Sequence, residues 1–303
     1  MTRAPQVAFL GDGRRLHLQD GPIDLIVEAH GNEADVRAAY AAAVQRFTGL
    51  LDELCVELSE LRRPAQPNRC VLQGEVARRM HAAVAPFCAE TFITPMAAVA
   101  GAVAEEILAA MTRVSILSRA YVNNGGDIAL YLARGERFAL GLVDRPDRPG
   151  LFGKAVLRAD DPARGVATSG WRGRSFSLGI ADAVTILAAT AAQADAAATV
   201  VANAVDLPGH PAILRAPANE LQPDSDLGDR RVTRAVGALS QAAIAEALEA
   251  GAAQAQRLLA VGLIAGAALH VQGGTRVVVP GNDAPLAAKR HVQAMRARET
   301  MDA

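Results

Sequence analysis

Aromatic residues and cysteines are both scarce in this chain of 303 residues. Phe, Trp and Tyr make up 4% of the sequence, too few for the stacking platforms of proteins that bind single-stranded nucleic acid. The three cysteines, Cys55, Cys70 and Cys88, form no CxxC pair and the six histidines show no ligand spacing, so no zinc site is expected. Cys55 lies on an apolar helical face, and we expect these thiols to be buried and unreactive.

Net charge and long apolar runs are missing as well. The chain has 31 basic and 32 acidic residues, a formal charge of -1, so no global field draws it to nucleic acid or to an anionic membrane. The first residues lack the apolar region of a signal peptide, and the apolar stretch Leu258–Leu269 is too short to span a bilayer. We expect a cytoplasmic protein without nucleic-acid or membrane partners, whose alanine-rich helices suit either a core or a homo-oligomer interface.

The chain does have the material for a large core, because 51% of its residues are hydrophobic. No G-x-G-x-x-G follows a strand and there is no P-loop, which excludes the ordinary dinucleotide and NTP motifs. Periodicity predicts strands within 7–29, a long helix over 33–63, helices near 74–84 and 95–111, strands within 120–158 and at 182–187, helices over 189–205 and 240–260, and strands within 265–279. Residues 208–231 read as an irregular covering segment. This order predicts an α+β fold with antiparallel sheets packed with helices, in one domain over 1–288 with a polar tail at 289–303.

The segment Asn124-Gly125-Gly126-Asp127 lies between two apolar runs. An Asn-Gly step in this setting is a strong hairpin signal, which accounts for the residues without any ligand. The backbone N–H groups of the two glycines could equally donate hydrogen bonds to phosphate oxygens. The Asp127 carboxylate could accept hydrogen bonds from a sugar or a base. The local sequence leaves both interpretations open.

A second segment, Ala167-Thr168-Ser169-Gly170, reads as a small-residue turn beside Arg172 and Arg174. Its hydroxyls and the forked donors of the arginines suit a phosphate or a carboxylate. A solvated turn with surface arginines explains the same residues. Trp171 fits either a ligand ring or the anchoring of the loop.

Asp195 and Thr199 lie four residues apart and therefore share one face of the predicted helix. A carboxylate beside a hydroxyl suits a hard cation such as Mg²⁺. The alternative is an acidic residue that interacts with the helix dipole. The earlier helix, Met96–Met111, begins with small residues, which allow close approach of either a ligand or a neighbouring backbone.

Together these segments resemble the motifs of the ApbE superfamily, the FAD:protein FMN transferases, and stand in the same order. The run 177–184, SLGIADAV, is similar to an uncharacterised branch of that superfamily. The resemblance spans about residues 6–280. It implies a T-fold related architecture and a cleft for FAD, FMN or a similar phosphate-bearing small molecule.

The resemblance also implies roles for particular residues. A magnesium ion would be held by Asp195, Thr199 and the backbone carbonyl of Ala100. The expected ligand contacts are Asn124, Gly125, Gly126, Asp127, Thr168, Ser169, Gly170 and Arg172.

The chain departs from the transferase pattern at two places. Gly101 stands where the transferases have a lysine, and the stretch 175–179 is short and lacks their histidine. Both departures argue against flavin transfer. Three functions therefore stay open: a magnesium-dependent transferase-like enzyme, a non-catalytic ligand-binding or accessory protein, and a biosynthetic enzyme for another cofactor, such as a pterin in one-carbon metabolism.

Overall fold

Nine strands form one central sheet in which every neighbouring pair is antiparallel. The computed structural model describes residues 4–143 and 151–281, so the expected tail at 289–303 lies outside the described residues. In spatial order the strands are β1 (Gln6–Phe9), β2 (Leu16–Asp20), β3 (Ile23–Gly31), β4 (Leu117–Asn124), β5 (Asp127–Leu132), β8 (Gly165–Ser169), β9 (Ala183–Ala188), β12 (Gly266–Val271) and β13 (Gly274–Val278).

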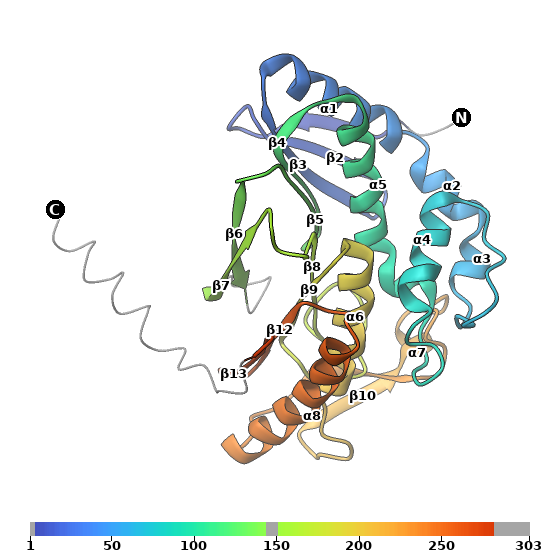
Figure 1. Ribbon diagram of the computed structural model, residues 1–303. Coiled ribbons are helices and arrows are strands. Elements are labelled where there is room, and N and C mark those ends of the chain that lie inside the picture. Colours follow the sequence, from blue (N-terminus) through green and yellow to red (C-terminus); the bar gives the residue numbers. More distant parts are fainter. Residues whose placement is uncertain (1–3, 144–150, 282–303) are drawn as a thin grey trace, which may run out of the picture.

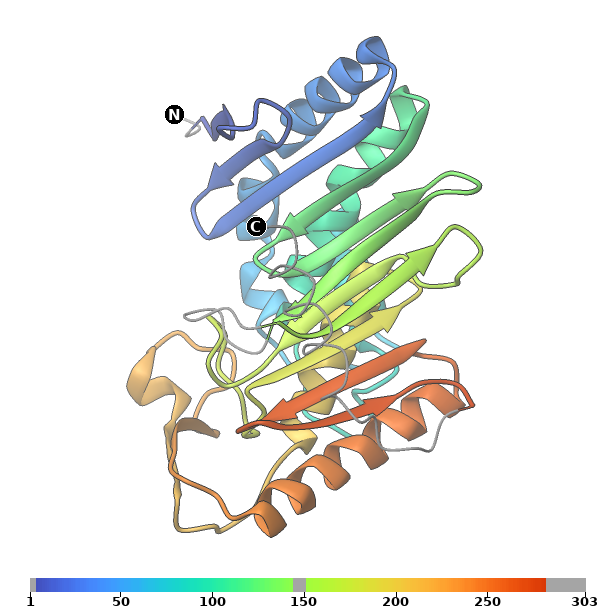
Figure 2. The ribbon, with the colours of Figure 1, turned by 90° about the vertical axis from the view of Figure 1, so that its left-hand side faces the viewer.

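Helices cover one face of this sheet, and a hairpin lies over part of the other (Figures 1 and 2). The long helices are α1 (Glu33–Phe47), α5 (Val99–Val114), α6 (Ala191–Ala204) and α8 (Gln241–Ala260). Shorter ones are α2 (Leu50–Val56), α3 (Leu58–Leu61), α4 (Glu75–Val84), η1 (Pro95–Ala98) and α7 (Ala218–Leu221). The hairpin on the other face is β6 (Arg137–Val143) with β7 (Leu151–Arg158), and a separate ladder joins β10 (Ile213–Pro217) to β11 (Arg231–Val236). The predicted α+β class with antiparallel sheets is confirmed.

The sheet consists of two halves with the same plan. In each half a strand pair, β2–β3 or β8–β9, is followed by helices and then by a second pair, β4–β5 or β12–β13. The halves meet where β5 pairs with β8, and this ladder holds only Ile128↔Val166 and Ala129↔Gly165. We call this junction, with the ends of β5 and β8 beyond it, the seam. Asp127 and Thr168 lie just beyond the last pair of this ladder, where the two halves meet.

Small residues let the helices approach one another closely beside the seam. A Cβ on Gly101 of α5 would lie 2.2 Å from the carbonyl oxygen of Ala191 at the start of α6. Alanines fill most of the buried face of α6, including Ala194, Ala197 and Ala198. The small-residue start of α5 therefore serves tight packing between helices, one of the two uses expected from the sequence.

The predicted continuous helix over 33–63 is wrong. The first helix ends at Phe47, Thr48 is extended, and Gly49 has φ of 83°, a left-handed conformation that interrupts the helix. The chain continues in α2 and α3. The apolar spacing resumes after the break, so periodicity alone did not reveal it.

Three other expectations are also corrected. Residues 208–231 contain β10, whose hydrogen-bond partner β11 begins at Arg231, so pairing at a distance gives this stretch its order. The expected small-residue turn at 167–170 is strand β8 as far as Ser169, because β9 pairs with it. Cys55, on α2, and Cys70, between α3 and α4, are exposed and not buried.

One helical segment of the described residues, Pro95–Val114, is long and apolar enough to cross a membrane by length and composition alone. Of its most apolar window, 61% is buried inside the protein. It lies between other helices and the sheet, as the core helix of a globular domain does.

Glu106 of this helix is 1% exposed and joins three helices. Its carboxylate accepts hydrogen bonds from Arg46 Nε of α1 at 2.6 Å and from Arg79 Nη1 of α4 at 3.0 Å. Burial raises its pKa, but the two arginines outweigh this, so the pKa of Glu106 lies below its ordinary value.

We expect Glu106→Ala to lower the free energy of unfolding by about 2 kcal/mol, because two arginines lose their buried partner. Glu106→Gln keeps the acceptor oxygen and should lower it less. Urea unfolding of the three proteins measures the difference. Equal stability of the wild type and Glu106→Ala would show that the network does not stabilise the fold.

Candidate functional site

Asp127 bridges the seam. It is the first residue of β5, and its Oδ1 accepts a hydrogen bond from the backbone N–H of Thr168 on β8 at 3.1 Å. The carboxylate thus takes the place of a main-chain acceptor beyond the point where the β5–β8 ladder ends. The structure thus brings together Asp127 and Thr168, which are 41 residues apart in sequence.

Asp195 reaches the same region from α6. Its Oδ2 accepts a hydrogen bond from the backbone N–H of Gly101 at 3.0 Å, in the first turn of α5. Ala98, the residue before that helix, provides no side-chain cap, so Asp195 supplies the missing acceptor from another helix. The site therefore lies where the N-terminal part of α6, the N-terminus of α5 and the seam meet.

Asn124 connects the β4–β5 turn to α5. Its Nδ2 donates to the carbonyl oxygen of Ala100 at 3.2 Å, and its side chain is 5% exposed. Gly125 and Gly126 have φ of 64° and 115°, so the predicted hairpin turn is confirmed. The N–H of Gly126 donates to Asn123 Oδ1 at 2.8 Å and is thus already used within the turn.

The two carboxylates of the site interact unfavourably when both are charged. Burial raises the pKa of Asp127 to about 7, while the Thr168 N–H and the positive charge of Arg174 oppose that rise. Burial also raises the pKa of Asp195 well above its ordinary value, and the negative charge of Asp127 adds to this. The N–H groups at the start of α5 oppose the rise without cancelling it. Ionisation of both groups therefore costs free energy, which a bound cation would offset.

This arrangement predicts a pH-dependent stability. The pKa of Asp127 is about 7 in the folded protein and 3.8 as an ordinary value, so the folded state holds its proton more tightly. The resulting stabilisation is complete below about pH 4 and is lost as pH rises through 7. The free energy of unfolding of the wild type, relative to Asp127→Asn, should fall between pH 4 and pH 7. Denaturant unfolding across that range measures it, and a rising difference would contradict the assignment.

The residues expected to hold magnesium are only partly assembled around Asp195. Thr199 lies one turn further along α6, and its hydroxyl has no hydrogen bond to the described residues. The carbonyl oxygen of Ala100 is near the site but already accepts from Asn124. The described part of the chain contains no group of three or more His, Cys, Asp or Glu that could hold a metal ion. A cation here would need hydroxyl, carbonyl, water or ligand oxygens besides the carboxylates.

The loop after β8 is built around Asp182, which is 8% exposed. Its Oδ1 accepts from Arg172 Nε at 2.8 Å and from Trp171 Nε1 at 3.2 Å. The Arg172 guanidinium also lies over the Trp171 ring, 4.2 Å from its centre. A Cβ on Gly170 would lie 2.4 Å from the Asp182 carbonyl oxygen, so the loop needs glycine there. Arg172 thus has a partner within the loop.

Two more of the predicted ligand contacts lie at the end of β8. The side chain of Thr168 forms a hydrogen bond, and Ser169 is the last residue of the strand. The Thr168 hydroxyl lies 2.9 Å from that of Thr185 on β9. Ser169 is partly exposed and pairs with Val184 across the ladder. Both residues sit at the rim of the seam and not in its interior.

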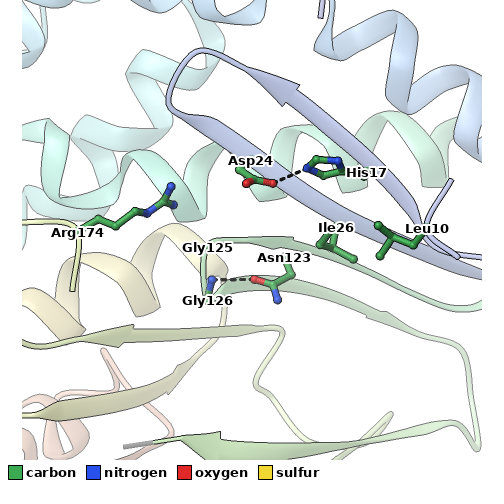
Figure 3. A pocket seen from close by; sticks show the side chains of 8 residues that line it. All are labelled: Leu10, His17, Asp24, Ile26, Asn123, Gly125, Gly126 and Arg174. Carbon is green, nitrogen blue, oxygen red and sulfur yellow. Dashed lines mark hydrogen bonds and ion pairs between the residues drawn. The ribbon is translucent and has the colours of Figure 1, made fainter. Parts of the chain in front are cut away.

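A pocket of about 400 Å³ lies beside the same turn (Figure 3). Of the predicted residues it includes Gly125 and Gly126. It also includes Arg174, which the sequence indicated as a possible anion-binding residue beside the segment 167–170. Its other lining residues were not selected from the sequence, and they are Leu10, His17, Asp24, Ile26 and Asn123. For His17, Asp24 and Ile26 the signal was the alternation of exposed and buried positions along β2 and β3, which indicates an open face without indicating a site.

Several curated proteins match parts of this chain. A UPF0280 protein of Methanopyrus kandleri is 35% identical over 182 residues, which cover 59% of this chain and 69% of that protein. A UPF0280 protein of Methanosphaerula palustris is 39% identical over 123 residues, covering 37% of this chain and 47% of its own length. A UPF0280 protein of Methanothermobacter thermautotrophicus is 40% identical over 122 residues, which cover 38% of this chain and 44% of that protein. The chain thus spans less than half of the last two relatives.

Among solved structures, the apo form of the Pseudomonas stutzeri flavinyl transferase ApbE is similar, with a TM-score of 0.46 and 12% identity. The match covers 90% of this chain and 94% of that one. The model of the family described as AbpE bacteria matches residues 7–277. The chain therefore belongs to this ApbE-like family, as its three motifs led us to expect.

Proposed function

We propose that this protein binds a flavin, or another phosphate-bearing heterocycle, at the seam with the help of Mg²⁺. The observation that carries the proposal is the meeting of Asp127 and Asp195 near the seam, where each carboxylate accepts a backbone N–H and both pKa values are raised. Carboxylates whose ionisation is disfavoured by their surroundings are typical of functional sites, where a bound cation can supply the opposite charge. The family and the three motifs support a flavin-like ligand.

The donor atoms of the site suit a hard cation. Asp195, the Thr199 hydroxyl and the Ala100 carbonyl would hold it, with waters or ligand oxygens completing the shell. Bound magnesium would offset the charge of a phosphate or pyrophosphate group. Asp127 would remain the residue that bridges the halves and adjusts the charge of the site through its own protonation.

A second function, ligand binding without transfer, is favoured by the packing at Gly101. The transferases have a lysine at this place, but here a Cβ would lie 2.2 Å from the Ala191 carbonyl oxygen. The backbones of α5 and α6 therefore occupy the space that a side chain would need. The protein has no cationic side chain at this position to assist a phosphoryl group.

Calorimetry of the full chain with FAD, in MgCl₂ and then in EDTA, tests the proposal. We expect binding in magnesium and at least tenfold weaker binding in EDTA. Chromatography of the same mixture for released AMP separates the two functions, since AMP is released when the FMN phosphoryl group of FAD passes to an acceptor hydroxyl, here that of water or of an added threonine peptide. Equal binding in both buffers would refute the metal role, and absence of FAD binding would refute a flavin as the ligand.

A further inference from the structure

The pocket beside the β4–β5 turn opens on the face of the sheet opposite the carboxylates. On β3, Asp24 and Ile26 alternate with Leu25 and Val27, which are buried under the helices. Asn123 of β4 likewise alternates with the buried Asn124, whose amide contacts α5. The Gly125-Gly126 turn is therefore the edge that separates the pocket from the carboxylate pair. At about 400 Å³, the pocket lies at the lower end of the range for small-molecule sites.

The lining combines an apolar wall with hydrogen-bonding groups of both kinds. Leu10 and Ile26 provide the apolar surface. His17 Nε2 lies 2.8 Å from Asp24 Oδ1, so with the proton on Nε2 the ring leaves Nδ1 as an acceptor. Asn123 accepts the Gly126 N–H through Oδ1, which leaves its amide group as a donor. A flat heterocycle with both donors and acceptors along its edge matches this set.

Arg174 supplies the charge. It is exposed, and it makes no hydrogen bond or ion pair with the parts of the chain that the structure describes. A Cβ on Gly125 would lie 2.1 Å from Arg174 Nη2, so the guanidinium rests against the turn only because residue 125 is glycine. Figure 3 shows the side chain extending toward the turn from its separate loop. Arg172, in contrast, is paired with Asp182 at 2.8 Å.

We propose that this pocket receives the ring of the ligand and that Arg174 binds the anionic group attached to that ring. The inference rests on the proposed function and adds the location of the ring and the identity of the anion-binding arginine. The anionic group then lies over the Gly125-Gly126 turn, between the pocket and the carboxylate pair. A cation held by Asp195 would meet the ligand from the other side of that turn.

Equilibrium binding of FMN and of riboflavin to the full chain tests this, because the two probes share a ring and differ in the phosphate. Arg174→Ala should weaken FMN at least tenfold and change riboflavin less than twofold. Asn123→Asp keeps the acceptor for the Gly126 N–H but removes the donor, so it should weaken both probes. Arg234→Ala removes an exposed arginine of β11 and is the control for net charge. Thermal unfolding confirms that each variant is folded.

The outcomes separate this inference from the proposed function. If FMN binds equally well to wild type and Arg174→Ala, but magnesium-dependent FAD binding persists, the pocket assignment is wrong and the proposed function stands. If Arg174→Ala weakens FMN binding as expected but magnesium does not change FAD binding, the pocket assignment is supported and the proposed metal site is wrong. If the wild type binds neither FMN nor riboflavin, both are overturned for flavins. 6-Carboxypterin, also an anionic heterocycle, then shows by the same Arg174→Ala comparison whether the pocket assignment holds for a pterin.

Discussion

Replacing Asp195 with asparagine should weaken magnesium-dependent binding of FAD by at least about 100-fold, while the fold remains intact. Asparagine keeps an oxygen that accepts the Gly101 N–H, a bond of 3.0 Å in the wild type, but it carries no charge for a cation. Burial and the neighbouring Asp127 already favour the neutral form at this position. Above pH 7, the free energy of unfolding of the Asp195→Asn protein should therefore equal or exceed that of the wild type.

Calorimetry in MgCl₂ and denaturant unfolding together measure these two effects. Asp229→Asn, at an exposed aspartate, is the matched control and should change neither. A functional carboxylate is indicated by loss of binding with unchanged or greater stability, since sites that bind ligands are often costly to the fold. Loss of stability with retained binding would show that Asp195 acts only as the cap of α5.

The second large effect is expected at Gly101. Gly101→Ala should lower the free energy of unfolding by about 3 kcal/mol or more, and the melting temperature by about 6 °C or more. The reason is steric, because the new Cβ would lie 2.2 Å from a backbone oxygen and 2.5 Å from its carbon, both on Ala191. Neither atom can move without separating α5 from α6. Gly101→Lys, which restores the residue of the transferases, should be at least as unstable and should not release AMP from FAD.

Gly11→Ala is the control for the loss of a glycine, because nothing lies within 4 Å of the Cβ that it would gain. Calorimetric melting of the three variants and the wild type measures the effect. A Gly101→Ala protein as stable as the Gly11→Ala protein would mean that the helices can separate at little cost. The argument from packing against a transferase lysine would then lose its basis.

Much of the local structure follows from the sequence. The helices near 74–84, 95–111, 189–205 and 240–260 and the hairpin at Asn124–Asp127 were predicted from periodicity and turn residues, and the structure confirms them. The prediction failed at Gly49, where one left-handed residue divides an apolar pattern that otherwise continues. It also failed at β10, because a strand held by a distant partner has no local signal.

The candidate site shows the same division. Its motifs were recognised as three separate segments, and the family to which the chain belongs confirms that resemblance. The family resemblance implied that Asp127 and Asp195 serve one cleft, but no local pattern predicted the charge interaction between them. Nor did the sequence distinguish the two arginines: Arg172 pairs with Asp182, whereas Arg174 lines the pocket.

By itself, then, the sequence determined the composition of the core, the type of most elements and the segments that carry chemistry. These depend on side-chain size, polarity and spacing within a few residues of one another. Only the tertiary structure decided that the β5–β8 ladder ends early, that α5 and α6 meet at backbone distance, and that two carboxylates lie close enough to repel each other. Each of these depends on contacts between residues more than about 35 positions apart, where no local pattern records which atoms will meet.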